Sequence, residues 1–168
     1  MTFLTTRQRH RSFIDGPRGR LRVLCAAVAL ATMAACNPTE ELVLADGSEQ
    51  LWSTLEGDWL LVNYWAKWCA PCRVEVPELN ELHEAGTTVL GVNFDGLAGS
   101  ELQADITDLG IRFPVALHDP RERWGARRPE VLPTTLVVAP DGSLHAVLVG
   151  PQTRESLMAA MGNSPDDP

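Results

Sequence analysis

This sequence of 168 residues has little cysteine and lysine: four cysteines, and a single lysine at position 67. After Cys36 it has no apolar stretch approaching the ~20 residues that a membrane-spanning helix needs. It also lacks a basic stripe with interleaved aromatic residues, and its formal charge of −8 should repel polyphosphate. The missing basic stripe and the negative charge both argue against nucleic-acid binding. With 45% hydrophobic and 21% charged residues, the composition is that of a globular protein with one domain.

The charge is divided unevenly along the chain. Six of the 14 basic residues precede position 23, against one of the 22 acidic residues, so residues 36–168 hold 8 basic and 21 acidic residues, a net charge of −13. The basic start is followed by 13 uncharged and mostly apolar residues at 23–35. This segment is too short to span a bilayer, but it has the length of a signal-peptide core. Residues 1–35 are therefore predicted to be a signal peptide.

The signal peptide ends in a run that resembles a bacterial lipoprotein box, Met33-Ala34-Ala35-Cys36. In such a box the cysteine is lipidated and becomes the new N-terminus. The box usually has leucine where Met33 stands, and the alternative is ordinary cleavage nearby that leaves Cys36 as a free thiol. We expect a lipid anchor on Cys36, a tether over residues 36–41 and a disordered tail over residues 163–168.

These expectations account for all four cysteines. Cys25 leaves with the signal peptide, Cys36 carries the lipid, and Cys69 and Cys72 remain as a pair. A secreted scaffold held together by disulfides would need more cysteines spread along the chain. The remaining pair is therefore not a structural framework.

Residues 42–162 are predicted to form one α/β domain. Strands are expected at 42–44 and 49–51 (a hairpin around Asp46-Gly47), 59–65, 87–94, 113–117, 134–139 and 144–149, and helices at 69–86, 100–109 and 153–161, with single helical turns at 52–56 and 121–125. Strands that alternate with helices need a sheet covered on both faces, and the last hairpin adds an antiparallel pair. The pattern predicts a central mixed β-sheet flanked by helices, with an N-terminal β-hairpin.

The run Trp68-Cys69-Ala70-Pro71-Cys72 follows a buried strand and begins a helix. Unpaired backbone N–H groups and the positive helix end favour an anion there, so the pKa of Cys69 should fall below the ~8.5 of a free thiol. Pro71 suits the first helical turn, where its missing N–H would have no partner. Cys69 is expected to attack a disulfide, and Cys72, which should be better shielded, to resolve the mixed disulfide.

Two alternatives for this cysteine pair are a structural zinc site and a purely structural disulfide. A structural zinc site needs four ligands, but the chain has no second pair of this kind, and its histidines at 83, 118 and 145 lack ligand spacing. No metal is therefore expected. A purely structural disulfide over so short a loop would remove little chain entropy. The position of the pair between a strand and a helix favours redox chemistry.

Residues 61–79 around the cysteine pair resemble the TlpA/ResA branch of the thioredoxin superfamily. Later blocks of the same branch are matched in the same order by Gly91-Val92-Asn93, Phe113-Pro114-Val115, Leu132-Pro133-Thr134-Thr135, Asp141-Gly142 and Gly150. The similarity covers Leu42 to Met161. It implies a thioredoxin fold, a position on the periplasmic side of a bacterial membrane, and reduction of protein disulfides by a monomer without a cofactor. Electrons would come from a membrane thiol carrier of the DsbD/CcdA kind.

The resemblance also implies a substrate-binding face. Pro133 matches a cis-proline that lies beside the dithiol and presents backbone to an extended substrate, although the sequence alone is equally consistent with an ordinary trans proline. Leu132 would then line the substrate groove. Trp68 is expected to lie partly exposed at this face, where a large ring can contribute to partner recognition. Trp65 is expected in the core.

Three polar residues near the cysteines have less certain roles. Asn63 stands where cytoplasmic thioredoxins carry a buried aspartate, and an amide cannot take a proton. Glu75 matches an acid that this branch carries three residues after the second cysteine, and it could accept the proton if burial raised its pKa. The alternative for Glu75 is a solvated carboxylate on the helix face. Lys67 is expected to be an exposed surface lysine.

The sequence thus predicts an exported, lipid-anchored disulfide reductase that acts through Cys69 and Cys72. Its substrates would be protein disulfides, such as those of apocytochrome c during cytochrome c maturation, or metal-site cysteines. A disulfide oxidant or isomerase is the alternative within the same chemistry, and the reduction potential decides between them. Two alternatives of other classes are a protein that binds Cu(I) through the two thiolates, assisted by His118, and a non-catalytic adaptor.

Overall fold

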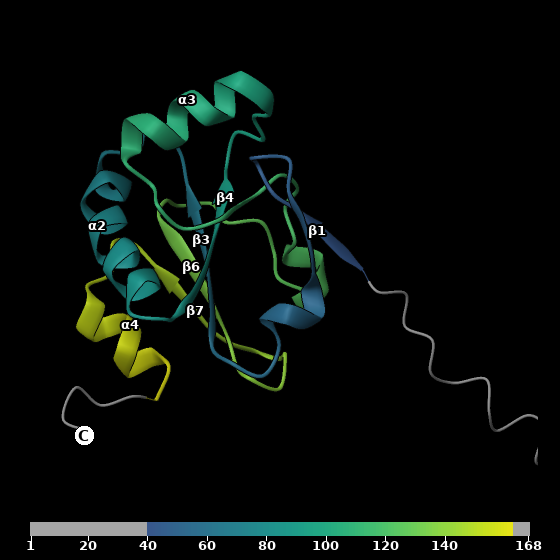
Figure 1. The fold of residues 1–168 in the computed structure, drawn as a ribbon. Coiled ribbons are helices and arrows are strands. Elements are labelled where there is room, and N and C mark those ends of the chain that lie inside the picture. The colour runs from purple at the N-terminus through teal and green to yellow at the C-terminus, as the bar shows by residue number, and fades with distance from the viewer. Residues whose placement is uncertain (1–39, 163–168) are drawn as a thin grey trace, which may run out of the picture. The chain divides into compact units, whose positions relative to one another are not determined.

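The computed structural model describes residues 40–162 (Figure 1). The predicted signal peptide, the predicted lipid anchor at Cys36, most of the predicted tether and the predicted tail at 163–168 lie outside these residues. The described residues all belong to one compact unit. Within the part of the chain that the structure describes, no helix is long and apolar enough to cross a membrane.

A five-stranded mixed sheet forms the centre of the domain, in the order β5-β4-β3-β6-β7. Its strands are β3 (Leu60–Trp65), β4 (Thr88–Asn93), β5 (Val115–Ala116), β6 (Thr134–Val138) and β7 (Leu144–Val149). Strands β3, β4 and β5 are parallel, whereas β6 runs antiparallel to both β3 and β7. The carboxyl ends of β3, β4 and β5 therefore meet at one edge, where ligand and active sites of such sheets usually lie.

Three helices cover one face of this sheet: α2 (Ala70–Glu84), α3 (Gly99–Leu109) and α4 (Arg154–Ala160). Every residue of β3 is buried, as its almost continuous apolar sequence predicts for a central strand. Side chains alternate along a strand, so Leu61 and Trp65 pack in the core under the helices. Leu60 and Tyr64 pack in a second core on the opposite face.

The second face is covered by shorter elements: β1 (Glu41–Val43), β2 (Glu49–Leu51), and the 3₁₀ turns η1 (Trp52–Leu55) and η2 (Arg121–Trp124). The rings of Trp52 and Trp124 meet edge to face at 5.9 Å and join the two turns. The β1–β2 hairpin also bonds to the edge of the sheet. Ala45 N–H donates to the Val115 carbonyl at 2.8 Å, and an isolated bridge pairs Leu44 with Ala116.

The predicted fold class is confirmed, including the N-terminal hairpin and the position of Trp65 in the core. Most boundaries agree within one or two residues, and two of the differences have a consequence for the fold. The strand expected at 113–117 is regular only at Val115–Ala116, because Pro114 has no N–H to donate; its carbonyl still accepts from Gly91 N–H at 2.8 Å. Strand β1 begins at Glu41, inside the predicted tether.

Candidate active site

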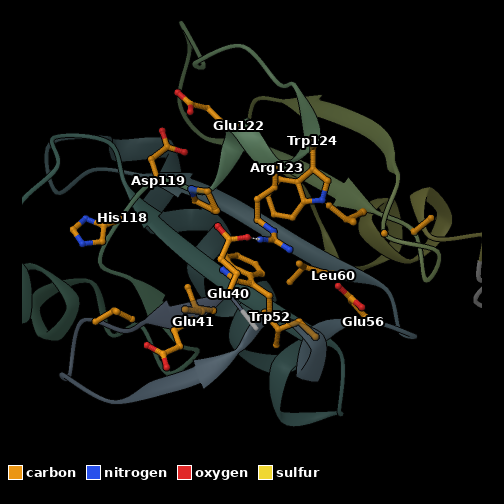
Figure 2. Close-up of a pocket in the computed structure, with 17 residues that line it drawn as sticks. Glu40, Glu41, Trp52, Glu56, Leu60, His118, Asp119, Glu122, Arg123 and Trp124 are labelled. Atoms are coloured by element: carbon orange, nitrogen blue, oxygen red, sulfur yellow. Dashed lines mark hydrogen bonds and ion pairs between the residues drawn. The ribbon is translucent and has the colours of Figure 1, made fainter. Parts of the chain in front are cut away.

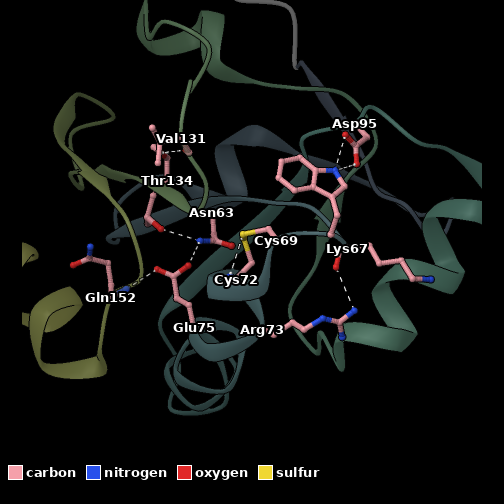
Figure 3. The surroundings of a disulfide bond; sticks show 12 residues. Asn63, Lys67, Cys69, Cys72, Arg73, Glu75, Asp95, Val131, Thr134 and Gln152 are labelled. Atoms are coloured by element: carbon pink, nitrogen blue, oxygen red, sulfur yellow. Dashed lines mark hydrogen bonds between the residues drawn. A yellow bond between two sulfur atoms is a disulfide. The ribbon is translucent and has the colours of Figure 1, made fainter.

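Cys69 and Cys72 form a disulfide at the start of α2, directly after β3 (Figure 3). Cys69 is the N-cap residue, and its Sγ accepts a hydrogen bond from Cys72 N–H at 3.2 Å. Pro71 occupies the first turn, as the sequence predicts. The two residues are 3% and 1% exposed, so Cys72 is the better shielded by only a small margin.

This position explains how the first cysteine becomes a nucleophile. The first backbone N–H groups of a helix have no partner within the helix, and the helix dipole places partial positive charge at its N-terminus. In the reduced protein the Sγ of Cys69 would keep the same position as an acceptor. Both effects favour its thiolate, which is the reactive form of a cysteine.

Four polar residues lie together on the buried side of the disulfide; we call Asn63, Glu75, Thr135 and Gln152 the buried polar cluster. Asn63 Nδ2 donates to Glu75 Oε2 at 2.7 Å and to Thr135 Oγ1 at 2.9 Å. The backbone N–H of Gln152 donates to Glu75 Oε1 at 3.1 Å. Three separate segments, β3, β6 and the loop before α4, thus hold one carboxylate of α2 in place.

Glu75 is 1% exposed, so the alternative of a solvated carboxylate on the helix face is wrong. Its side chain points inward because it lies three residues after Cys72, on the side of α2 that packs against the sheet. Burial raises the pKa of Glu75 to about 7, against the opposing effect of the hydrogen bonds from Asn63 and Gln152. An acid with this pKa can gain and lose a proton near neutral pH.

The peptide bond between Leu132 and Pro133 is cis, as the resemblance implies. The Pro133 carbonyl accepts a hydrogen bond from Gly150 N–H at 2.8 Å, which ties this segment to the end of β7. Leu132 is partly buried and packs against both cores, whereas Val131 before it is 54% exposed. The contribution of Leu132 and Pro133 to substrate binding stays a prediction.

Four residues form the surface on the other side of the disulfide; we call Trp68, Phe94, Asp95 and Arg128 the exposed rim. Trp68 is 65% exposed, as expected for a residue at a binding face. Its Nε1 donates to the Asp95 carboxylate at 3.0 Å, and its ring meets that of Phe94 edge to face at 6.3 Å (Figure 3). The guanidinium of Arg128 lies 4.3 Å from the centre of the Phe94 ring.

Lys67 is half-exposed, in agreement with the prediction of a surface lysine. Its Nζ lies 3.1 Å from Asp105 and 3.9 Å from Asp108, both on α3. Arg73 pairs with the same Asp108 carboxylate at 2.9 Å, and its hydrogen bond together with the charge of Lys67 lowers the pKa of Asp108. Lys67 is therefore paired with acidic side chains of α3 and is not an unpaired charge beside Cys69.

His118, the histidine considered for Cu(I), lines a cavity of about 690 Å³ between the hairpin and η2 (Figure 2). The lining includes Trp52, Trp124 and Arg123 but neither Cys69 nor Cys72. Within residues 40–162 there is no group of three or more histidine, cysteine or acidic side chains that could hold a metal ion. Copper binding would therefore depend on the two cysteines without His118.

The sequence reasoning missed Thr135, Gln152 and Asp95. Thr135 could have been found, since the other residues of its strand are apolar apart from Thr134. Its side chain also faces the same side as Asn63, its partner across the β3–β6 pair. Gln152 contributes a backbone N–H and Asp95 lies in a loop, so neither has a sequence pattern that marks it.

Comparisons with known proteins agree with this geometry. The model of the AhpC/TSA family matches residues 35–147. The thiol-disulfide oxidoreductase ResA of Bacillus thuringiensis is 30% identical over 107 residues, which cover 61% of each chain. The chain thus spans about three fifths of that relative's length. The thiol:disulfide interchange protein HelX of Rhodobacter capsulatus is 32% identical over 133 residues, 77% of this chain and 68% of HelX.

Solved structures show the same fold. The exposed lipoprotein thioredoxin of Streptococcus pneumoniae superimposes with a TM-score of 0.57 at 26% identity, covering 73% of this chain and 97% of the other. The chain therefore belongs to the AhpC/TSA family, and its resemblance to the TlpA/ResA branch of the thioredoxin superfamily is confirmed.

Proposed function

We propose that this protein is an exported, lipid-anchored thiol–disulfide oxidoreductase that reduces disulfides in other proteins. The main support for the proposal is that the two cysteines of the disulfide lie in different environments. Cys69 Sγ caps a helix N-terminus next to an exposed tryptophan, and a buried carboxyl with a pKa of about 7 lies behind Cys72. The first environment suits a nucleophile and the second suits proton transfer.

The reaction transfers two electrons and two protons from the reduced dithiol to the substrate. The thiolate of Cys69 attacks one sulfur of the substrate disulfide, forms a mixed disulfide and releases a substrate thiolate, which takes up a proton. The thiolate of Cys72 then attacks Cys69 Sγ and releases the second substrate sulfur. The substrate leaves as a dithiol, and the disulfide between Cys69 and Cys72 is restored.

Glu75 acts in the second step. Cys72 must lose its proton before it can attack, and it is shielded from solvent. Ionised Glu75 accepts this proton, and the protonated acid returns it to the departing sulfur. A carboxyl whose pKa lies near the working pH is present in both forms, which is the condition for acting as base and then as acid.

The substrate binds across the face that carries Trp68, Leu132 and Pro133. A half-exposed aromatic ring next to a reactive group is a usual contact for a protein partner. Protein disulfides fit this open face better than a small molecule that needs an enclosed pocket. Candidate substrates are the cysteines of apocytochrome c or of a metal site.

Export and anchoring are supported by the basic and apolar start of the chain and by the lipoprotein box at Cys36. The pneumococcal structure is described as an exposed lipoprotein thioredoxin, which is consistent with such an anchor. In an oxidising compartment a reductase must be re-reduced continuously. A membrane thiol carrier of the DsbD/CcdA kind would supply these electrons. A Cys36→Ser substitution should release the protein from the membrane fraction, and retention there would contradict lipid anchoring.

The deciding experiment is the reduction potential of the dithiol, measured against glutathione or thioredoxin. A value near ~−270 mV or lower supports a reductase, whereas a value near ~−120 mV identifies an oxidant. A Cys72→Ser variant should then accumulate mixed disulfides through Cys69 with its substrates. The matched Cys69→Ser variant should accumulate none. Equal trapping by both variants would contradict the assigned order of attack.

A further inference from the structure

Asn63 has more hydrogen-bonding capacity than the described structure uses. An amide side chain carries two N–H donors and an oxygen with two lone pairs. Both donors are occupied, by Glu75 and Thr135, but Oδ1 has no partner within residues 40–162 although it is fully buried. An unpaired buried acceptor is costly, because it has lost its hydrogen bonds to water and gained none in the protein.

The orientation of this amide follows from its partners. With Glu75 ionised, only the amide nitrogen can approach Oε2 at 2.7 Å, because an oxygen there would face the lone pairs of the carboxylate. The unpaired oxygen is therefore directed away from Glu75. Figure 3 shows it on the side of the disulfide, with the nitrogen on the side of Glu75.

We propose that Asn63 is a positioning residue that stabilises the reduced dithiol, because its Oδ1 accepts a hydrogen bond from the thiol of Cys72. In the disulfide neither sulfur has a hydrogen to donate, so the oxygen lacks a partner. Cys69 already accepts from a backbone N–H and favours its thiolate, so the protonated sulfur of the reduced pair is Cys72. This inference rests on the proposed redox function of the pair.

The balance of the reduction step shows where the new donor comes from. Two electrons from an external thiol pair break the bond between Cys69 and Cys72, which leaves Cys69 as the thiolate, and one proton completes the thiol of Cys72. The proton on Cys72 is the donor that Asn63 meets only in the reduced protein. The Oδ1 of Asn63 therefore responds to the oxidation state of the dithiol, while its Nδ2 positions Glu75 for proton transfer.

The test measures the dithiol–disulfide equilibrium in glutathione buffers by alkylation of free thiols. Asn63→Leu keeps the number and branching of the side-chain heavy atoms but removes the acceptor. The equilibrium should therefore shift about tenfold toward the disulfide, which is about 30 mV more negative for two electrons. The matched control is Asn80→Leu in α2, eight residues after Cys72. Asn80 is also buried, and its amide bonds Gly110 and Arg112 at 2.9 and 2.8 Å.

The Asn80→Leu variant should lose stability with no shift in the equilibrium. A second variant, Asn63→Asp, retains an oxygen toward the dithiol but loses both N–H donors. Its potential should not be more negative than that of the wild type, whereas the titration of Glu75 should move to higher pH because a second carboxyl lies beside it. The inference is overturned if Asn63→Leu leaves the equilibrium unchanged, or if Asn63→Asp or Asn80→Leu shifts it as far as Asn63→Leu does. The glutathione equilibrium needs no protein substrate, so it can succeed or fail independently of insulin reduction by the wild type, which tests the proposed function.

Discussion

The two sides of the disulfide differ in the surroundings of their charged side chains. On the buried side, Glu75 is enclosed by neutral donors and has no basic partner within residues 40–162. On the exposed side, Asp95 bonds the Trp68 ring, and Lys67 pairs with acids of α3 in contact with solvent. Burial changes the pKa of the enclosed carboxyl by a large amount, whereas surface pairs are weakened by water and salt.

This difference separates two tasks that one disulfide must perform. Proton transfer needs a group whose pKa is set by the protein, and only the buried polar cluster provides one. Partner recognition needs accessible area, and only the exposed rim provides that. Substitutions on the buried side should therefore change pH dependence and stability, and substitutions on the exposed side should change substrate affinity.

The largest expected effect is on stability. Glu75 holds its proton more tightly in the folded protein, where its pKa is about 7, than in the unfolded chain, where it has the ordinary value of 4.5. The folded state therefore binds more protons between these values, and the free energy of unfolding should fall as the pH rises from 4.5 to 7, by on the order of 3 kcal/mol. Urea denaturation of the oxidised protein measures this slope. Glu75→Gln should abolish that part of the slope, and an unchanged slope would contradict the burial effect.

The next effect is on the rate of disulfide reduction. Glu75→Gln removes the proton acceptor, so insulin reduction at pH 7 should slow by about a hundredfold, within the usual range for general acid–base catalysis. The pH profile should also lose its inflection near pH 7. Glu81→Gln is the control, because Glu81 is an exposed carboxyl on the same helix. If the Glu75→Gln profile kept its inflection, another group would be the proton acceptor.

A smaller effect is expected on the exposed rim. Trp68→Ala removes a ring that is 65% exposed, so stability should change by no more than about 0.5 kcal/mol. The KM for a protein disulfide should rise about tenfold, which corresponds to the loss of an interface contact. Oxidised glutathione, which is too small to cover the rim, serves as the comparison substrate. A fall in the rate with glutathione equal to that with protein would assign Trp68 to the chemistry instead.

The smallest effect is expected at Lys67. Its ammonium is half-exposed and paired with Asp105, so Lys67→Gln should change the reduction rate by less than about threefold at 0.15 M salt. A rate that fell by tenfold or more, at low and at high salt alike, would show that the lysine assists the Cys69 thiolate. Stopped-flow kinetics with a small disulfide as substrate would compare the reduction rates of Lys67→Gln and the wild type.

Local sequence patterns predicted much of the fold. The apolar run of β3 identified a central strand, and Cys69 with Pro71 identified the start of α2. Both depend on interactions within a few residues. The placement of β6 between β3 and β7, by contrast, depends on contacts between distant segments, and periodicity does not reveal it.

The active site shows the same division. The cysteine pair and the exposed Trp68 followed from the sequence, but whether Glu75 was buried did not. Its burial depends on Asn63 and Gln152, which lie 12 and 77 residues away in the chain. A carboxylate in the first turns of a helix is equally suited to solvent, so only the packing of α2 against the sheet decides.

The N-terminal hairpin has a consequence for how this protein can be shortened. Its backbone bonds at Ala45 and Leu117, and its bridge from Leu44 to Ala116, occupy the outer edge of β5. An uncovered strand edge is a template on which other chains can add strands and aggregate. A fragment that begins after Ser48 would retain the disulfide yet expose that edge, so a soluble form of the domain should begin no later than Glu40.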